Sequence, residues 1–220
     1  MVGVRRCEVL VVGGGPGGYV AGIRSAQLGL DTVIVEGSKY GGTCLIRGCI
    51  PSKAIIHAAD RFESLSQHAK EGGHMGISVH ESPSLNMKDL VGWKDSIVDR
   101  LNKGVESLLK TAGAEVIHGW ATFTGAKTCR VEMDGEHLDI EADNVILATG
   151  SSHIDLPFMP CDEELILSST GALDLQELPE TAAIVGGGYI GLELGCALAK
   201  LGTKVTVIEG MGDVLSLIHI

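Results

Sequence analysis

An internal repeat is the feature that most constrains how this 220-residue chain can fold. Residues 9–37 and 182–210 align without a gap and share 11 of 29 residues. Each copy holds a short apolar run, the pattern Gly-Gly-Gly-x-x-Gly, a helical stretch ending in Leu-Gly, and a second apolar run closed by Glu-Gly. The order strand, glycine turn, helix, strand predicts two βαβ motifs with parallel strands, and therefore an α/β fold.

The glycines of each copy stand where a Rossmann-like, dinucleotide-binding turn needs them. The first allows a tight turn out of the strand, the next leaves room for a pyrophosphate, and the last lets the helix pack closely. The pyrophosphate would lie on unpaired N–H groups at the helix N-terminus. An acidic residue 23 positions after the first glycine could accept hydrogen bonds from a ribose diol. These residues are Gly13, Gly15, Gly18 and Glu36 in the first copy and Gly186, Gly188, Gly191 and Glu209 in the second. The alternative is glycine-rich turns that bind no ligand, which the recurrence of the whole context at equal spacing disfavours.

The stretch between the copies has a different pattern. Residues 87–112 place apolar side chains at i, i+3, i+4 and i+7 and stop at a glycine, which predicts a long amphipathic helix. Residues 116–140 contain short alternating runs around an Asp-Gly turn, which predicts a β-meander. Residues 144–150 (NVILATG) predict a buried strand ending in a turn, and the proline-containing residues 151–180 predict a connector.

Two cysteines in the segment GGTCLIRGCIPSK are candidates for redox chemistry. In an ideal helix the Cα atoms of Cys44 and Cys49 would be roughly 8–9 Å apart, whereas a disulfide needs about 4.4–6.8 Å. Gly48 and Pro51 indicate that regular helix begins near Ile50–Pro51, so a disulfide across a distorted turn is feasible. The helix dipole and Lys53 favour a thiolate at Cys49. From spacing alone, two buried cysteines without redox function remain an alternative.

Composition argues against several classes of function. A formal net charge of −11 and an aromatic content of 4% disfavour a nucleic-acid partner. The sequence holds no run of 18 apolar residues, so it predicts neither a membrane span nor a membrane partner. Its six cysteines and eight histidines show no zinc-ligand spacing, so no metal site is predicted. The N-terminus shows no signal-peptide pattern, which predicts a cytoplasmic protein.

With these motifs in this order, the chain resembles the pyridine nucleotide–disulfide oxidoreductases. GGGPGG, GGTCLIRGCIPSK, VILATG and GGGYIGLELG follow one another as in the family, and the resemblance covers residues 7–215. It departs from the family at Ile46 and Arg47, where Asn-Val is usual. The chain is most similar to members that oxidise dihydrolipoamide for 2-oxo acid dehydrogenase complexes. The resemblance implies FAD in the first βαβ motif, NAD in the second, and a redox disulfide between the two cysteines.

The resemblance also implies roles for individual residues. Cys49 would lie against the flavin, and Cys44 would meet the dithiol substrate. Lys53 would lie near flavin N5 and form a buried ion pair with Glu193. The residues implied to contact FAD are Gly13, Gly15, Gly18, Glu36, Gly42, Thr43, Lys53, Gly119, Ala121, Thr149 and Gly150. Those implied to contact NAD are Gly186, Gly188, Tyr189, Ile190, Gly191 and Glu209.

The resemblance further implies how the chain divides. Residues 1–150 would form the first segment of an FAD-binding domain, 151–180 a connector, and 181–215 the start of an incomplete NAD-binding domain. Residues 216–220 depart from the family and are expected to be an atypical tail. Family members continue into a dimerisation domain with a His–Glu acid/base pair, which no residue here matches. The expected partners are the lipoyl domain of a 2-oxo acid dehydrogenase complex and, at full length, a second copy.

Two alternatives to this function remain open. One is an enzyme similar to mercuric or glutathione reductase. Glu209 disfavours those that use NADPH, because a 2′-phosphate prefers Arg to a carboxylate. Ser52 disfavours glutathione reductase, which tends to have Lys at that position. The other alternative is a truncated, non-catalytic FAD-binding fragment.

Overall fold

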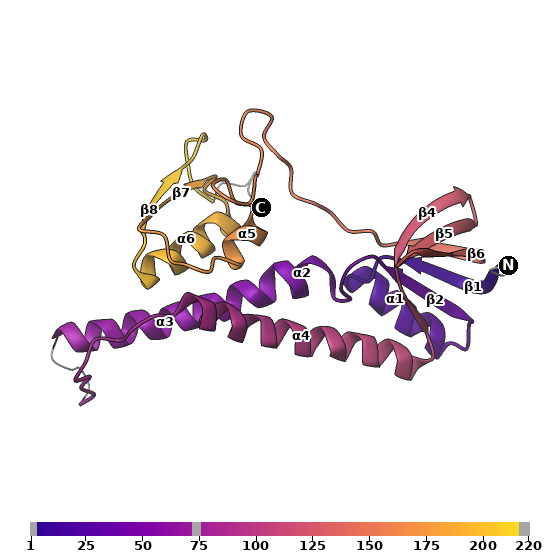
Figure 1. The fold of residues 1–220 in the computed structure, drawn as a ribbon, viewed down its shortest axis with the longest axis horizontal. Coiled ribbons are helices and arrows are strands. Elements are labelled where there is room, and N and C mark those ends of the chain that lie inside the picture. The colour runs from indigo at the N-terminus through magenta and orange to yellow at the C-terminus, as the bar shows by residue number, and fades with distance from the viewer. Residues whose placement is uncertain (1–3, 72–75, 216–220) are drawn as a thin grey trace. The chain divides into compact units, whose positions relative to one another are not determined.

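The computed structural model describes residues 4–71 and 76–215, so the predicted tail at 216–220 lies outside the described residues. The chain forms two compact units (Figure 1). Unit 1 contains residues 1–46 and 98–152, and unit 2 contains residues 47–97 and 153–220. The chain therefore passes from one unit to the other three times.

Unit 1 is built on one six-stranded sheet in the order β3-β2-β1-β6-β5-β4. Its strands are β1 (Arg5–Val12), β2 (Thr32–Glu36), β3 (Glu115–His118), β4 (Trp120–Gly125), β5 (Thr128–Met133) and β6 (Glu136–Leu147). Strands β1, β2, β3 and β6 are parallel, and helix α1 (Pro16–Gln27) joins β1 to β2. Strands β4, β5 and β6 form the predicted antiparallel meander. The first βαβ motif and the α/β fold class are confirmed.

Strand β6 differs from the prediction for residues 137–150. Instead of two strands, one 12-residue strand pairs with β5 through its first half and with β1 along most of its length. The expectation of a buried strand at 144–150 is wrong, because none of these residues is buried and Leu147, where the strand ends, is 67% exposed. Beyond Glu141 the strand pairs only with β1 among the described strands, so β5 no longer flanks it.

The two faces of the sheet bury different residues because side chains alternate along a strand. On one face, residues of α1 and of helix α4 (Met87–Ala112) pack against β1 and β2. The buried members of that cluster are Val9, Val11, Ile34, Tyr40, Val105, Leu109 and Ala114. The other face is a cluster of strand residues that includes Leu10, Val33 and Val131. The bounds of α4 match the predicted helix over 87–112.

Unit 2 contains the second βαβ motif and a long helix. Strands β7 (Thr181–Val185) and β8 (Lys204–Ile208) are parallel and are joined by α6 (Tyr189–Leu201), so this motif is also confirmed. Helix α3 (Cys49–Glu71) packs against α6 through Ile55, Ala59, Leu194, Ala197 and Leu201.

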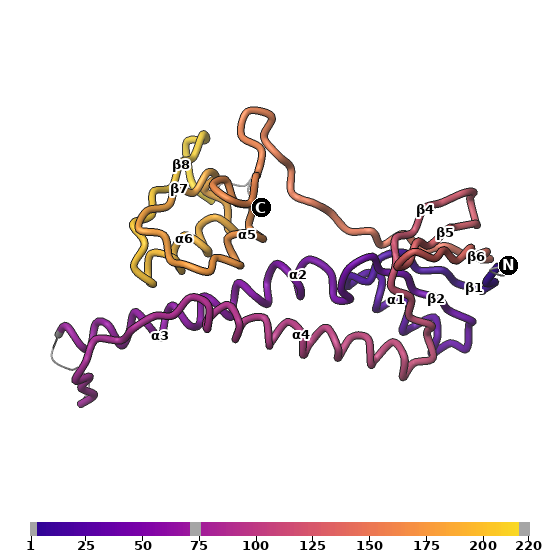
Figure 2. Tube along the Cα trace, viewed as in Figure 1, coloured from indigo at the N-terminus to yellow at the C-terminus, as the bar shows by residue number. Residues whose placement is uncertain are grey.

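The predicted connector at 151–180 contains a helix that the sequence pattern did not predict, α5 (Ser169–Leu173). Ser168 caps α5, since its hydroxyl accepts the N–H groups of Thr170 and Gly171 at 3.1 and 3.4 Å. The Cα trace shows α5 followed by β7, α6 and β8 in order (Figure 2). In the described part of the chain, no helix is long and apolar enough to cross a membrane.

Candidate functional site

The first glycine turn accepts only glycine at two of its predicted positions. Gly13 has φ +103°, and a Cβ at this residue would lie 2.1 Å from the carbonyl oxygen of Ala148. A Cβ at Gly18 would lie 1.7 Å from the carbonyl oxygen of Gly13. The turn therefore closes on itself and on the end of β6, where Ala148 donates its N–H to Val12 at 2.8 Å.

At Gly15, unlike Gly13 and Gly18, the surrounding protein would not exclude a side chain. Gly15 is the N-cap of α1 with an extended backbone, and a Cβ there would meet its nearest neighbour, Gly42 Cα, at an ordinary 3.5 Å. The protein itself leaves room for a side chain at this residue, which fits a cradle shaped for a ligand at the helix N-terminus. Gly42 lies close by with φ +68° and could not carry a Cβ, which would approach Gly15 Cα to 2.6 Å.

The structure gathers four further residues predicted for FAD around the same turn. Gly42 opens α2 (Gly42–Arg47), and the exposed Thr43 follows it. Thr149 and Gly150 follow Ala148, which contacts the turn. These residues meet at the carboxyl ends of parallel strands, the usual place for a ligand in an α/β sheet.

The carboxylate of Glu36 crosses the turn from the end of β2. Its Oε2 accepts the N–H of Gly14 at 2.7 Å, and its Oε1 accepts the N–H and hydroxyl of Ser38 at 2.8 and 2.9 Å. An ionised carboxylate has about four lone-pair positions, so it retains capacity for a ribose hydroxyl.

The second copy repeats this geometry in unit 2. Gly186 has φ +102°, and a Cβ at Gly191 would lie 2.6 Å from the carbonyl oxygen of Gly186. Glu209 accepts the N–H of Gly187 on Oε2 and the N–H of Met211 on Oε1, both at 2.7 Å. The repeat in the sequence is thus also a repeat of backbone conformation and hydrogen bonding.

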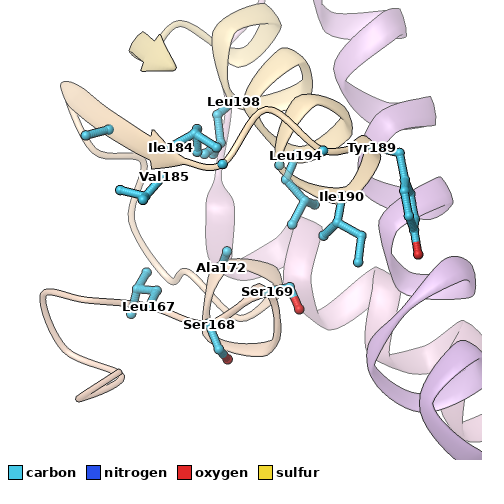
Figure 3. A pocket seen from close by; sticks show the side chains of 14 residues that line it. Leu167, Ser168, Ser169, Ala172, Ile184, Val185, Tyr189, Ile190, Leu194 and Leu198 are labelled. Atoms are coloured by element: carbon cyan, nitrogen blue, oxygen red, sulfur yellow. The ribbon is translucent and has the colours of Figure 1, made fainter. Parts of the chain in front are cut away.

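A cavity of about 440 Å³ lies beside the second turn, between α5, β7 and α6 (Figure 3). Gly188 caps the N-terminus of α6 without a side chain and lines this cavity with Tyr189, Ile190 and Gly191. Figure 3 shows that its wall is largely apolar, with hydroxyls from Ser168 and Ser169 on α5 and its cap. Gly186 lines the cavity too, so five of the six residues predicted for NAD share one concave surface.

A second cavity, of about 610 Å³, lies in unit 1 next to Glu36. Gly37, Gly119 and Trp120 line it, and Gly119 donates its N–H to the carbonyl oxygen of Glu36 at 2.9 Å. Gly119, predicted to contact FAD, is therefore at the cavity. Ala121 instead packs against the core of the sheet.

The two candidate redox cysteines lie on consecutive helices. Cys44 is half-buried in α2, Gly48 separates the helices, and Cys49 is the exposed first residue of α3. The segment is not one regular helix, so the spacing of an ideal helix does not apply to the two cysteines, which are not joined by a disulfide in the structure. Helix α3 begins at Cys49, just before the predicted start near Ile50–Pro51, so Cys49 lies at a helix N-terminus.

The structure brings Lys53 and Glu193 together within unit 2. Lys53 Nζ donates to Glu193 Oε1 and Oε2 at 2.7 and 2.6 Å. The expectation that this pair is buried is wrong here, because the side chains are 57% and 39% exposed. The apolar residues of α3 and α6 form the buried contact, and the ion pair lies at its solvent-exposed margin.

Tyr40 was not identified from the sequence as part of the site, although its ring packs against Gly14 of the first glycine turn. It is fully buried, and a Cβ at Gly14 would lie 2.5 Å from its ring. Its hydroxyl oxygen lies 3.1 and 2.8 Å from the carbonyl oxygens of Ile34 and Ile117, which share its single proton. Burial raises the pKa of Tyr40 above its ordinary value, so it stays a neutral donor. No local pattern marks a single aromatic residue in a loop.

Known proteins share this arrangement. The sequence matches the model of the family described as pyridine nucleotide-disulphide oxidoreductase over residues 7–219. Dihydrolipoyl dehydrogenase of Pseudomonas aeruginosa is 48% identical over 213 residues, which are 96% of this chain and 45% of that protein. Dihydrolipoyl dehydrogenase of Geobacillus stearothermophilus is 48% identical over 209 residues, 95% of this chain and 43% of the relative. The chain therefore spans less than half the length of these curated relatives.

Solved structures show the same fold. LpdA of Mycobacterium tuberculosis has a TM-score of 0.83 and 26% identity, and the match covers 97% of this chain and 46% of that one. The HOCl-induced flavoprotein disulfide reductase RclA of Escherichia coli has a TM-score of 0.77 and 29% identity, with 94% and 43% covered. The family and its dihydrolipoyl dehydrogenases use FAD and NAD(P). From the two repeated turns, the cysteine segment and the family match over residues 7–219, we conclude that this chain belongs to the pyridine nucleotide-disulphide oxidoreductase family.

Proposed function

We propose that this chain carries the FAD site, the NAD site and the redox cysteines of a flavoprotein that oxidises protein-bound dihydrolipoamide with NAD⁺. The observation that carries the proposal is the duplicated contact of a glycine N–H with a strand-end carboxylate. Gly14 meets Glu36 in unit 1, and Gly187 meets Glu209 in unit 2, each at 2.7 Å. Two such turns in one chain support two dinucleotides, and the curated relatives support the substrate.

The cysteines would perform thiol–disulfide exchange with the dithiol. A substrate thiolate attacks the sulfur of Cys44, the Cys44–Cys49 bond breaks, and Cys49 leaves as a thiolate. The second thiolate of the substrate then attacks the substrate sulfur that is bonded to Cys44. The bond to Cys44 breaks, the substrate leaves as a cyclic disulfide, and Cys44 becomes a thiol after protonation. The N-terminus of α3 stabilises the negative charge on Cys49. Bound FAD supplies the two-electron acceptor for this dithiol.

The remaining residues would bind and orient. Gly13, Gly15 and Gly18 shape the FAD turn, and Glu36 holds its ribose. Glu209 would select NAD over NADP, since a carboxylate repels a 2′-phosphate. The ion pair with Glu193 would orient the Lys53 ammonium, because both carboxylate oxygens accept from it.

The proposed partners follow from the same relatives. They are the lipoyl domain of a 2-oxo acid dehydrogenase complex and, for a full-length protein, a second copy of itself. Division of the chain into an FAD-binding segment at 1–150, a connector at 151–180 and an NAD-binding segment from 181 is part of this proposal. Cytoplasmic location stays a prediction from the sequence.

Two matched variants test the proposal by ligand binding. Glu36→Ala should weaken FAD binding and leave NADH binding unchanged, and Glu209→Ala should do the reverse. Flavin and nicotinamide fluorescence titrations measure both affinities on the purified chain, with circular dichroism as the folding control. If neither ligand saturates the chain, or both variants weaken the same ligand, the proposal is wrong. In a full-length protein, a higher kcat/KM with glutathione disulfide and NADPH than with dihydrolipoamide and NAD⁺ would favour the glutathione reductase alternative.

A further inference from the structure

Three potential metal ligands of different chemistry meet in unit 2, on the segment that leads to α5. The ligand atoms of His153, Asp155 and Cys161 all lie within 4.8 Å of one another. His153 Nε2 is 3.4 Å from Asp155 Oδ1, and the same oxygen accepts the N–H of Cys161 at 3.2 Å. The pattern His-x-Asp-x₅-Cys is no familiar zinc spacing, which is why the sequence alone predicts no metal site.

A tight turn, rather than a helix or a sheet, brings these side chains together. Leu156 and Met159 form an isolated antiparallel bridge, and Met159 donates its N–H to Leu156 at 2.9 Å. Prolines within and beside the turn restrict its backbone. The chain reverses between Asp155 and Cys161, so two residues six positions apart face each other.

We infer that His153, Asp155 and Cys161 bind a divalent d-block cation of the zinc class through an imidazole nitrogen, a carboxylate oxygen and a thiolate sulfur. Zinc takes all three donors at about 2.0–2.3 Å, which in a tetrahedron sets donor–donor distances of about 3.4–3.8 Å. The cluster reaches this range with a contraction of about 1 Å. Thiol and imidazole donors favour zinc over calcium or magnesium, which prefer oxygen.

The charge and exposure of the cluster suit such an ion. A thiolate and a carboxylate together balance the two positive charges of the cation. His153 and Asp155 are exposed and Cys161 is half-buried, so water can reach the fourth coordination position. Coordination replaces the thiol proton, which is released to solvent.

Two neighbouring carboxylates, Asp162 and Glu163, accept backbone N–H groups, and the cluster found among the described residues has three protein ligands. Asp162 Oδ1 accepts the N–H groups of Leu165 and Ile166, both at 2.8 Å. Glu163 Oε2 accepts the N–H of Ser168 at 3.3 Å. These acidic groups contribute attractive potential for a cation without entering its coordination sphere.

Cobalt(II) provides a direct test, because its thiolate complexes absorb light by charge transfer and zinc complexes do not. The experiment uses the 220-residue chain with Cys44→Ser and Cys49→Ser, so the candidate redox thiols cannot contribute. Co²⁺ should produce a thiolate charge-transfer band that saturates at one ion per chain, and Zn²⁺ should abolish it. This background makes the outcome independent of the proposed enzymatic function.

Further substitutions assign the band to the cluster. Cys161→Ser should abolish it, and His153→Gln and Asp155→Asn should each weaken Co²⁺ binding about tenfold or more. Cys196→Ser is the matched control, because Cys196 is an exposed cysteine of the same unit and should leave the band unchanged. No saturable band, a band retained after Cys161→Ser, or equal loss after Cys196→Ser overturns the inference. If Cys161→Ser unfolds the chain by circular dichroism, undiminished binding in both His153→Gln and Asp155→Asn overturns it instead.

Discussion

The indole of Trp120 occupies the space beside Gly37, where a Cβ would lie 2.6 Å from ring atoms Cδ2 and Cε2. Trp120 is nevertheless 69% exposed and lines the cavity next to Glu36. A dinucleotide with its ribose at Glu36 directs its base away from the glycine turn, toward this cavity. The exposed indole is therefore placed to contact the base.

Tryptophan fluorescence tests this placement. In a Trp93→Phe chain, which leaves Trp120 as the only tryptophan, ADP or FAD should change the emission. Trp120→Leu should weaken ADP binding about fivefold or more, because stacking of a base on an aromatic ring contributes about 1–3 kcal/mol. Trp93→Leu is the matched control and should bind ADP normally. An emission that is unchanged at saturating ADP contradicts the placement.

Glu209→Arg should reverse the nucleotide preference of the second site. The carboxylate repels a 2′-phosphate, whereas a guanidinium attracts it, so affinity for NADPH relative to NADH should rise about tenfold or more. Glu209→Gln keeps an acceptor for the N–H of Gly187 and should give an intermediate ratio. Nicotinamide fluorescence titration measures both ligands. Glu177→Arg changes net charge equally at an exposed acidic residue and should leave the ratio unaltered.

The two candidate redox cysteines, Cys44 and Cys49, should not be equivalent. In FAD-loaded Cys44→Ser, the Cys49 thiolate at the N-terminus of α3 should give a long-wavelength charge-transfer absorption without added reductant. Cys49→Ser should lack this band. An absorption spectrum of each FAD-loaded variant measures the band. A band in Cys49→Ser alone would show that the assigned roles are reversed.

Tyr40→Phe should destabilise unit 1 and loosen the first glycine turn. The hydroxyl shares its proton between two carbonyl groups at a fully buried position, so its loss should lower the free energy of unfolding by about 1–3 kcal/mol. FAD affinity should fall as well, because the lost hydroxyl bonds hold the ring in its place against Gly14. Urea denaturation and FAD titration measure the two effects. Tyr19→Phe, in helix α1, is the control, and an equal effect there would contradict the prediction.

The ammonium of Lys94 is a buried charge held within unit 2. Its side chain is 4% exposed and contacts Asp174 and, at 2.9 Å, Asp95. Asp174→Asn should lower the free energy of unfolding by about 1–3 kcal/mol, because it removes an ionised partner of a desolvated charge. The second substitution Lys94→Met should recover part of that loss.

An exposed ion pair of the same unit provides the comparison for Lys94. Asp60→Asn breaks the pair with Lys200, whose side chain is 36% exposed, and should leave the urea denaturation curve nearly unchanged. Equal losses for Asp174→Asn and Asp60→Asn would show that burial of Lys94 has no energetic consequence.

Local sequence patterns determined much of the secondary structure of this protein. The repeated glycine turns predicted both βαβ motifs, the apolar spacing predicted the bounds of α4, and an Asp-Gly turn predicted the hairpin between β5 and β6. Each of these depends on residues within one or two turns of chain, where periodicity and the special conformations of glycine act directly. The order of the motifs was equally readable, and the family match over residues 7–219 agrees with it.

Tertiary structure alone decided the features that join distant parts of the chain. Tyr40 packs beneath Gly14, Trp120 covers Gly37, the Lys53–Glu193 pair is exposed rather than buried, and β6 is one strand instead of two. The contact of Asp155 with Cys161 depends on a turn that no known spacing of metal ligands in a sequence predicts. Burial and close contacts arise when segments that are distant in the sequence pack together. The sequence pattern shows which residues can take part in this packing, but not which of them come together.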